Sequence, residues 1–341
     1  MKLSKKSIEW AFAHLLKEND TDLFPEPLEI EIMHCKRDDI IARLQNLDIG
    51  AYEWKPFRRF LVPKGELSYR MITQLNPLDS LVLSAIIYEF GSKIEEKRVP
   101  ESEKCVFSYR FAPDEDGTLY SRADSWKDFW ETNLENARNC GCIACLDISD
   151  FYNQIYHHTL ENMMIYAGIP KEIIKSVMRL LEYLTQKMSR GLPVGPHAAH
   201  LLAEMSLIPI DDSLHVHGIH YCRYADDIIV FAENEVDART KIYKIAEILD
   251  QNQRLMLQRQ KTRLLGKTEF LEYATQMIAD NPLNIEETEM LEVIGRYSDN
   301  NPYVKISHSS LTTPEKQIFS KEKVATVYKG NIIKNLIMDC Q

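Results

Sequence analysis

The chain has 341 residues, 45% of them hydrophobic and 27% charged, a composition that excludes a disordered chain and suffices for two or three packed subdomains. Its net charge of −10, from 41 Lys and Arg against 51 Asp and Glu, excludes a protein that wraps nucleic acid by bulk positive charge, so any phosphate contact must be local. No apolar run approaches the roughly 20 residues that span a bilayer, no signal-peptide core follows the first residues, and the seven cysteines suggest no disulfide framework, so we expect a soluble, cytoplasmic protein without a membrane partner.

The first part of the chain is predicted to be helical and then to form a basic hairpin. Apolar residues at helical spacing predict helices over 7–20 and 37–47, within an N-terminal helical lead-in that covers 1–54. Two short strands are expected within 59–75, followed by an apolar helix over 77–90. The hairpin and its approach carry a cluster of basic residues: Lys55, Arg58, Arg59, Lys64 and Arg70. Phosphate binding and an ordinary solvated surface are both open for this cluster.

A short apolar strand is predicted over 143–148, with Asp147 near its end. Helical spacing follows up to Pro170, and a further helix covers about 171–187. No second pair of Cys or His stands at zinc-binding spacing nearby, so core packing is favoured over a zinc site for the cysteines at the strand entrance. These are Cys140, Cys142 and Cys145.

The glycine and proline turn at 191–196 opens an apolar helix that we expect to be buried. Runs that favour β structure at 219–223 and 228–232 flank Asp226 and Asp227, which predicts a hairpin with both acids at its tip. After the hairpin we expect three regions: an amphipathic helix over 236–252, a short strand pair near 255–273, and small helices over 281–341.

The two acids at the hairpin tip indicate a metal site. Neighbouring carboxylates repel by roughly 1 kcal/mol or more unless a cation lies beside them. If the strand that carries Asp147 lies next to the hairpin, three carboxylates meet at the rim of one sheet, and such oxygens select Mg²⁺, or Mn²⁺ as a substitute. Two ions about 4 Å apart can stabilise an attacking 3′-oxygen and a departing pyrophosphate. An Asp-Asp pair alone is a weak signal, because solvated turns commonly contain one.

The motifs resemble those of reverse transcriptases in order and spacing. CLDISDFYNQIYHHTL at 145–160 is similar to motif A of that family, GLPVGPHAAHLLAEMSL at 191–207 to motif B, and YADDIIVF at 224–231 to motif C. LQRQKTRLLG at 257–266 and EFLEY at 269–273 resemble motifs D and E. Upstream, LVPKGELSYRMITQLNPLDSLVLSAI resembles the fingers motif.

The resemblance implies an α+β fold, a right-hand polymerase with an antiparallel-sheet palm of ferredoxin-like (RRM-like) core, fingers and a short helical thumb. It implies fingers over 55–140, a palm with motifs A to E over 141–280 that holds part of the fingers, and a short helical thumb or C-terminal region over 281–341. The implied activity is that of an RNA-directed DNA polymerase, a nucleotidyltransferase that joins deoxynucleoside triphosphates (dNTPs) with two Mg²⁺ ions.

Carried over residue by residue, the resemblance assigns metal binding to Asp147 and Asp226, with Asp227 in support and the carbonyl of Ile148 as a further ligand. Tyr152 stands where the family has an aromatic ring beneath the incoming sugar. A rigid ring at that place would clash with a ribose 2′-hydroxyl, so deoxynucleotides are expected. Ordinary packing at a helix start is the alternative for Tyr152.

Further residues match family positions around the substrate. Lys64 and Arg70 match positions that grip the triphosphate, a role suited to a lysine point charge and a forked guanidinium. Gly191 and Gly195 bracket a turn whose backbone can approach a base pair, although a helix-capping turn would have the same sequence. Lys261 matches a lysine that can protonate the leaving pyrophosphate, and a solvated lysine is the alternative.

The chain also departs from common retroelement enzymes, which have a glutamine at the position of Val194 and Ser-Pro at Ala199-His200. The form GLPVGP before an LAE helix is closer to the bacterial reverse transcriptases of abortive infection and antiviral defence. That resemblance implies an RNA template or a bound non-coding RNA, a DNA product, and, with a short thumb, a protein partner or a homo-oligomer. The histidines near the motifs receive no role: His157, His158, His197 and His200.

Two alternatives to templated synthesis stay open. The same site could add deoxynucleotides without a template or onto a protein hydroxyl, and the 16 tyrosines give no means to choose an acceptor. A polymerase-like module that binds nucleic acid without catalysis would be indicated by loss of one acid, and all three acids are present.

Overall fold

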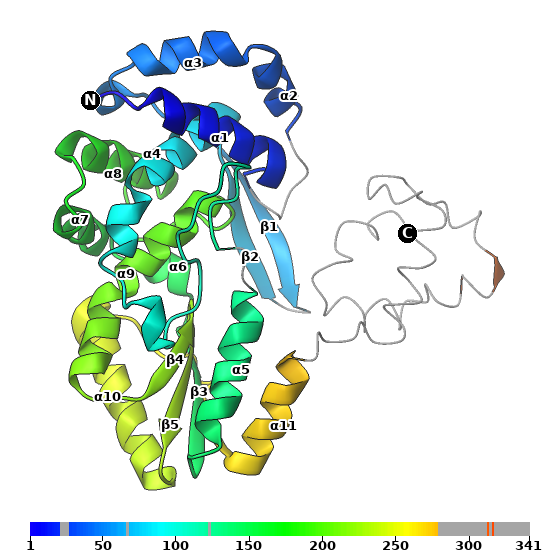
Figure 1. Cartoon of the computed structure of the whole chain (residues 1–341), viewed down its shortest axis with the longest axis vertical. Helices are drawn as coiled ribbons and strands as arrows, with labels where there is room; N and C mark the ends of the chain where they lie inside the picture. The colour runs from blue at the N-terminus through cyan, green and yellow to red at the C-terminus, as the bar shows by residue number, and fades with distance from the viewer. Residues whose placement is uncertain (21–26, 66–67, 122–123, 279–311, 314–315, 317–341) are drawn as a thin grey trace. The chain divides into compact units, whose positions relative to one another are not determined.

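The computed structural model describes residues 1–20, 27–65, 68–121, 124–278, 312–313 and 316 (Figure 1). The chain divides into two compact units. The first comprises Met1–Leu61 and Met71–Thr275, and the second Val62–Arg70 and Gln276–Gln341. The small helices expected over 281–341 lie almost entirely outside the described residues, so the thumb stays a prediction, as do the boundaries of fingers and palm.

The first unit contains an antiparallel sheet with the strand order β4-β5-β3-β6. Its strands are β3 (Cys142–Asp147), β4 (Tyr221–Tyr224), β5 (Asp227–Ala232) and β6 (Arg263–Gly266). All residues of β3 are buried, as in a strand that is covered on both faces. The predicted strand that carries Asp147 and the predicted hairpin that carries the two acids are therefore confirmed, within two residues at their ends.

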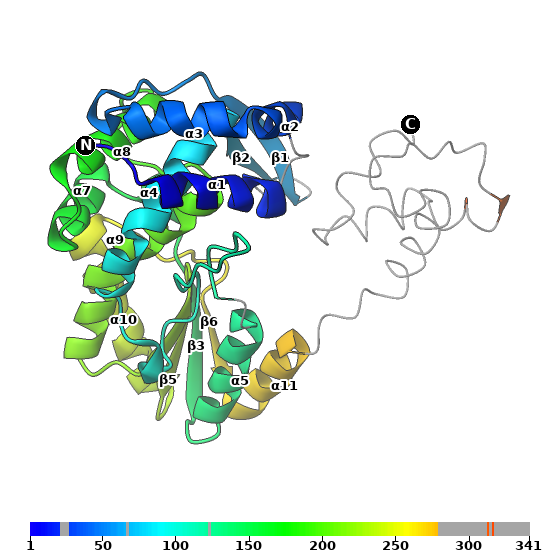
Figure 2. The same cartoon turned by 45° about the horizontal axis from the view of Figure 1, so that its top comes forward.

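Helices cover both faces of this sheet, and Figures 1 and 2 show α10 on one side and α5 with α11 on the other. Their bounds are Ser125–Ala137 for α5, His197–Val216 for α9, Glu235–Gln253 for α10 and Lys267–Ile278 for α11. The prediction of a strand pair near 255–273 is wrong in its second half, because EFLEY belongs to α11. Phe270 and Ala274 are fully buried at a spacing of four residues, which is the spacing of one helix face. Helix α5 was not predicted.

The remaining helices of the first unit precede the sheet or connect its strands. They are α1 (Lys5–Glu18), α2 (Leu28–Cys35), α3 (Arg37–Asn46), α4 (Pro77–Glu95), α6 (Phe151–Gln154), α7 (His157–Tyr166) and α8 (Lys171–Leu184), with short 3₁₀ turns at Ile49–Ala51 and Glu101–Glu103. Asn76 caps α4 through its side chain, and Pro77 takes the first helical position, which needs no N–H donor. Strands β1 (Arg58–Gly65) and β2 (Ser68–Gln74) form a two-stranded sheet, as predicted.

The single helix that the sequence predicts from 151 to Pro170 is interrupted after Gln154. The backbone N–H of Gly191 donates to the carbonyl oxygen of Ile155 over 2.8 Å, and Tyr156 forms a β-bridge with Arg190. Contacts with a segment over 30 residues away thus replace the helix at the two residues Ile155 and Tyr156. This interruption matters for the site, because it joins the segment after β3 to the glycine turn.

Candidate active site

Asp147 and Asp227 lie directly opposite each other at one end of the sheet. Asp147 ends β3, Asp227 begins β5, and the two are partners in the antiparallel register. Opposed residues of an antiparallel pair point to the same face, with Cβ atoms roughly 5 Å apart. The third acid, Asp226, precedes Asp227 in the turn, and its carbonyl oxygen accepts a hydrogen bond from the N–H of Ile148 over 3.0 Å. The fold thus brings the strand end of Asp147 and Ile148 next to the turn of Asp226 and Asp227, because β3 and β5 are neighbours.

The turn that carries Asp226 has an unusual backbone. Tyr224 and Asp227 pair as the last and first residues of β4 and β5, which leaves Ala225 and Asp226 as a two-residue loop. Ala225 has φ +51°, in the left-handed region that favours glycine, and this conformation costs an alanine roughly 1 kcal/mol. Two side chains hold its peptide groups: Ser108 Oγ accepts from the N–H over 2.8 Å, and Arg223 Nη1 donates to the carbonyl oxygen over 3.0 Å.

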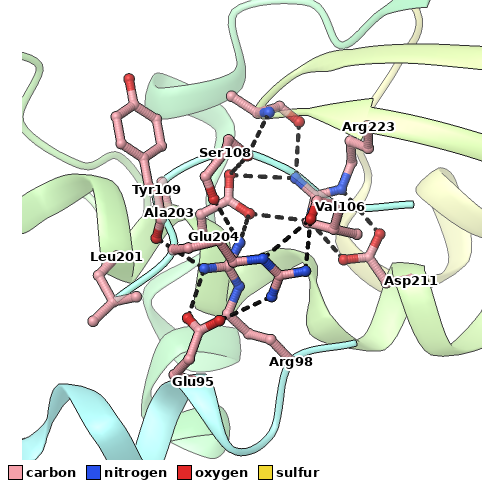
Figure 3. A network of polar contacts seen from close by, with 12 residues as sticks. Glu95, Arg98, Val106, Ser108, Tyr109, Leu201, Ala203, Glu204, Asp211 and Arg223 are labelled. Carbon is pink, nitrogen blue, oxygen red and sulfur yellow. Dashed lines mark hydrogen bonds and ion pairs between the residues drawn. The ribbon is translucent and has the colours of Figure 1, made fainter. Parts of the chain in front are cut away.

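Behind this turn lies a buried network of charges (Figure 3). Arg223 is fully buried, donates to the two carboxylate oxygens of Asp211 over 2.9 and 2.6 Å, and lies 3.1 Å from a carboxylate oxygen of Glu204. Glu204 also accepts from Arg98 over 2.8 Å and from Ser108 over 2.6 Å. Every charge in this group has an opposite charge beside it, without which burial would be strongly unfavourable.

Each charged group of the network favours the ionised form of its partners. Burial by itself would raise the pKa of Glu204, but Arg223 and Arg98 outweigh it and hold that pKa below its ordinary value. Burial would lower the pKa of Arg223, but Asp211 and Glu204 raise it well above its ordinary value. The sequence did not predict this network. Two features of the sequence could have indicated it: a single Arg before YADD, and a single Glu within the apolar run LLAEMS.

Lys261 lies beside the first acid. Its Nζ donates to a carboxylate oxygen of Asp147, while the backbone N–H of Gln258 donates to the carbonyl oxygen of the same aspartate over 2.7 Å. Burial would lower the pKa of Lys261, but its hydrogen bond with Asp147 and the charges of the three acids raise that pKa. The lysine is half-exposed and positively charged at neutral pH, so it can both neutralise Asp147 and donate a proton.

Tyr152 is fixed at two points by the segment that starts with the glycine turn. Its carbonyl oxygen accepts from the N–H of Leu192 over 2.8 Å, and its hydroxyl group shares a hydrogen bond of 2.5 Å with Nδ1 of His200. The ring is partly exposed, and burial raises the pKa of the hydroxyl group well above its ordinary value. The ring packs against the main core. The position in α6 therefore combines helix-start packing with an accessible aromatic surface.

The glycine turn has the backbone that its sequence predicts. Gly191 has φ +106° and Gly195 φ +130°, both in the region that only glycine adopts readily. Beyond its bond to Ile155, Gly191 accepts at its carbonyl oxygen from Nε2 of His157 over 2.8 Å. Between the glycines, the carbonyl oxygen of Val194 accepts from Thr73 N–H over 2.8 Å. The turn is thus held against α7 and β2.

Lys64 and Arg70 belong to the second unit. Lys64 lies in β1, with its side chain outside the part that the structure describes, and Arg70 is exposed in β2. Their role at the triphosphate stays a prediction.

The residues at the sheet end fit a hard divalent ion better than zinc. Carboxylate and carbonyl oxygens from Asp147, Asp226, Asp227 and Ile148 are the ligand type of Mg²⁺ and Mn²⁺. Among the described residues, no group of three or more His, Cys, Asp or Glu side chains is placed so that it could hold a metal ion. Phosphate oxygens and water commonly supply the other ligands of Mg²⁺.

The cysteines at the entrance of β3 are buried or half-buried free thiols. Burial raises the pKa of Cys140 and Cys142 above its ordinary value and that of Cys145 to about 12. Zinc binds the thiolate, so core packing is the role that these thiols fit.

One family model matches most of the chain. The model of the family described as "Reverse transcriptase (RNA-dependent DNA polymerase)" matches residues 62–275. Among solved structures, the chain is similar to telomerase from Candida albicans, determined in complex with a fragment of telomeric RNA, with 11% identity and a TM-score of 0.44. The similarity covers 64% of this chain and 43% of the telomerase chain, so this chain spans less than half of that protein's length. No curated protein matches the chain.

Proposed function

Because the chain belongs to the reverse transcriptase family, we propose that it is an RNA-directed DNA polymerase whose reaction takes place at Asp147, Asp226 and Asp227. Its α+β fold with an antiparallel sheet is that of a right-hand polymerase. The observation that carries the proposal is the register of β3 and β5, which sets Asp147 opposite Asp227 with Asp226 in the adjoining turn. Two carboxylates opposed in register, with a third in the next residue, are not a core-packing arrangement, and this supports the proposal.

Enzymes with reverse transcriptase domains generally use divalent metal ions. In our proposal Asp147 and Asp226, with Asp227 and the Ile148 carbonyl, hold two Mg²⁺ ions. These ions supply Lewis-acid stabilisation of the 3′-oxygen and of the departing pyrophosphate. Lys261, which donates a hydrogen bond to Asp147, would supply the proton that the departing pyrophosphate takes up.

The substrate in this proposal is a deoxynucleoside triphosphate. The partly exposed ring of Tyr152 lies beneath the sugar and leaves no room for a 2′-hydroxyl group. Gly191 and Gly195 let the backbone approach the base pair, and Lys64 and Arg70 bind the triphosphate. The support for these roles is the match to the family positions, together with the left-handed backbone of both glycines.

The proposed setting is bacterial antiviral defence of the abortive-infection kind, and its support is the GLPVGP and LAE sequence of the glycine turn and α9. The proposed template is RNA, which can be a bound non-coding RNA, and a protein partner or a second copy is also part of the proposal. No helix in the described part of the chain is long and apolar enough to cross a membrane. Cytoplasmic localisation stays part of the proposal.

A polymerase assay tests the proposal. The purified full chain is supplied with Mg²⁺ and labelled dNTPs, with and without an RNA template and a primer. We expect template-dependent incorporation, and its loss in an Asp226→Ala, Asp227→Ala double variant. A matched control is the Asp38→Ala, Asp39→Ala variant, because these adjacent acids are exposed in the first turn of α3.

Each other outcome identifies an alternative. Incorporation that survives loss of Asp226 and Asp227 refutes the assigned site. Incorporation that requires no RNA favours untemplated or protein-primed synthesis. No incorporation under any condition, with RNA still bound, favours a module that binds nucleic acid without catalysis.

A further inference from the structure

His200 is in direct contact with the residue that would sense the sugar of the incoming nucleotide. Its Nδ1 lies 2.5 Å from the hydroxyl oxygen of Tyr152, and the two rings meet edge to face with centroids 5.9 Å apart. Forty-eight residues separate them in the chain. His200 stands on α9, in the first turn after the glycine turn, where the common retroelement enzymes have the proline of a Ser-Pro pair.

The imidazole of His200 is itself held in place. Tyr109 stacks on it with ring centroids 4.2 Å apart and an angle of 7° between the planes. Tyr109 is fixed in a left-handed backbone conformation, with φ +46°, and its carbonyl oxygen accepts from Arg98 over 2.9 Å. Tyr120 packs against Tyr109, and its hydroxyl group donates to the carbonyl oxygen of His197 over 2.6 Å, one turn before His200. Loop and helix thus fix the ring from two sides.

The histidine is a neutral partner. Burial lowers the pKa of His200 to about 3, and a smaller effect of His197 acts in the same direction. At neutral pH the ring carries no charge, so its bond with Tyr152 is an ordinary neutral hydrogen bond in a fixed place. Such a bond suits a positioning role and does not suit proton transfer at pH 7.

We propose that His200 is a positioning residue for sugar selection, which holds the Tyr152 ring where it excludes a ribose 2′-hydroxyl group. This inference rests on the proposed function, and within it on Tyr152 as the gate. The backbone of Tyr152 is already fixed by the bond from Leu192, so only the two side-chain torsions remain free. The bond to His200 fixes the far end of the side chain, and without it the ring can tilt away from the sugar.

The selection of deoxynucleotides over ribonucleotides measures this role. The readout is the ratio of kcat/KM for a dNTP to kcat/KM for the matching ribonucleotide, with Mg²⁺, an RNA template and a DNA primer. Tyr152→Ala removes the ring and should lower the ratio most. His200→Phe keeps an aromatic ring that can stack on Tyr109 and removes the nitrogen that bonds Tyr152. The ratio should therefore fall by up to roughly tenfold, which corresponds to the free energy of one neutral hydrogen bond.

Two further variants separate the hydrogen bond from simple packing. Tyr152→Phe removes the hydroxyl group of the same hydrogen bond and should lower the ratio by a similar factor. The double variant Tyr152→Phe, His200→Phe should show no further loss, because both changes remove one bond. His200→Asn, whose side-chain amide can replace Nδ1 as a hydrogen-bond partner, should recover part of the ratio. His158→Phe is the matched control, because this histidine is exposed on α7.

Failure of the inference can be told apart from failure of the proposed function. If Tyr152→Ala lowers the ratio while Tyr152→Phe and His200→Phe leave it at the wild-type value, Tyr152 is the gate and the role of His200 is refuted. If Tyr152→Ala leaves the ratio unchanged, the gate itself is wrong, and the inference with it. If the wild-type protein incorporates no nucleotide although circular dichroism shows it folded, the proposed function fails first.

Discussion

Arg223 donates a hydrogen bond from Nη1 to the carbonyl oxygen of Ala225, over 3.0 Å, so this residue of β4 also fixes the hairpin turn. The same guanidinium neutralises Asp211 and Glu204 inside the protein. A buried charge network is therefore continuous with the backbone that carries Asp226. The stability of this network and the geometry of the acids should change together when it is disturbed.

The first prediction concerns Arg223. Replacement of Arg223 by Met leaves two buried carboxylates without their main partner, and should lower the free energy of unfolding by about 3–5 kcal/mol. Urea denaturation measures the loss. Arg239→Met removes an exposed arginine that pairs with Glu235 and should cost less than about 0.5 kcal/mol. A loss for Arg223→Met as small as that of the control would contradict the role of the network.

The second prediction concerns the glycine turn. Gly191→Ala should destabilise the protein by about 1–2 kcal/mol, because φ +106° is strained for any residue with a Cβ atom. The added Cβ would meet no atom closer than 3.4 Å, so the cost comes mainly from the backbone. Gly266→Ala is the matched control, since no atom lies within 4 Å of its added Cβ. Thermal denaturation measures the loss of stability in both variants. Equal losses would show that the turn tolerates a side chain at Gly191.

The third prediction concerns pH and His14, a buried histidine of α1 that hydrogen-bonds the carbonyl oxygen of Gly117 over 2.7 Å. Burial lowers its pKa from 6.5 to about 4. Between these values the unfolded chain binds the proton more readily than the folded protein, so the contribution of His14 to stability is complete above pH 6.5 and is lost as the pH falls toward 4. From pH 7 to 5 the loss should be about 2 kcal/mol.

Comparison with a His14→Phe variant isolates this effect from other titrating groups. The buried Asp20, whose pKa burial raises to about 7, acts in the opposite direction, but it is present in both proteins. The variant should be less stable than the wild type at pH 7, and the difference should narrow at pH 5. A constant difference across this range would mean that His14 is not the titrating group.

The fourth prediction concerns Lys261. If it gives the proton to the leaving pyrophosphate, Lys261→Ala should lower kcat by roughly 10²-fold or more, the usual worth of a general acid. Lys244→Ala is the control, because that lysine pairs with Glu247 on the surface of α10. Single-turnover incorporation with excess enzyme would isolate the chemical step. If the Lys261→Ala variant is as active as the Lys244→Ala variant, Lys261 is not the proton donor and serves only as a counter-ion of Asp147.

Local sequence patterns predicted much of the fold. The strand that carries Asp147, the hairpin with its two acids and the long helix of 235–253 were all found close to their real limits, because each is set by side-chain periodicity and turn residues within the element itself. The prediction failed for EFLEY, whose short apolar run fits a strand or a helix equally well. There the burial of Phe270 and Ala274 favoured the helix.

The sequence by itself indicated which residues we propose for the chemistry: three acids, each at the end of a strand or in a tight turn, within motifs that resemble those of reverse transcriptases. The tertiary structure alone decided how they meet. The register that opposes Asp147 and Asp227, and the bond between Tyr152 and His200, join residues 48 or more positions apart, and no periodicity within one element encodes such a pairing. The histidines near the motifs had no assigned role for that reason, and the structure brings one of them, His200 of α9, within hydrogen-bond distance of Tyr152.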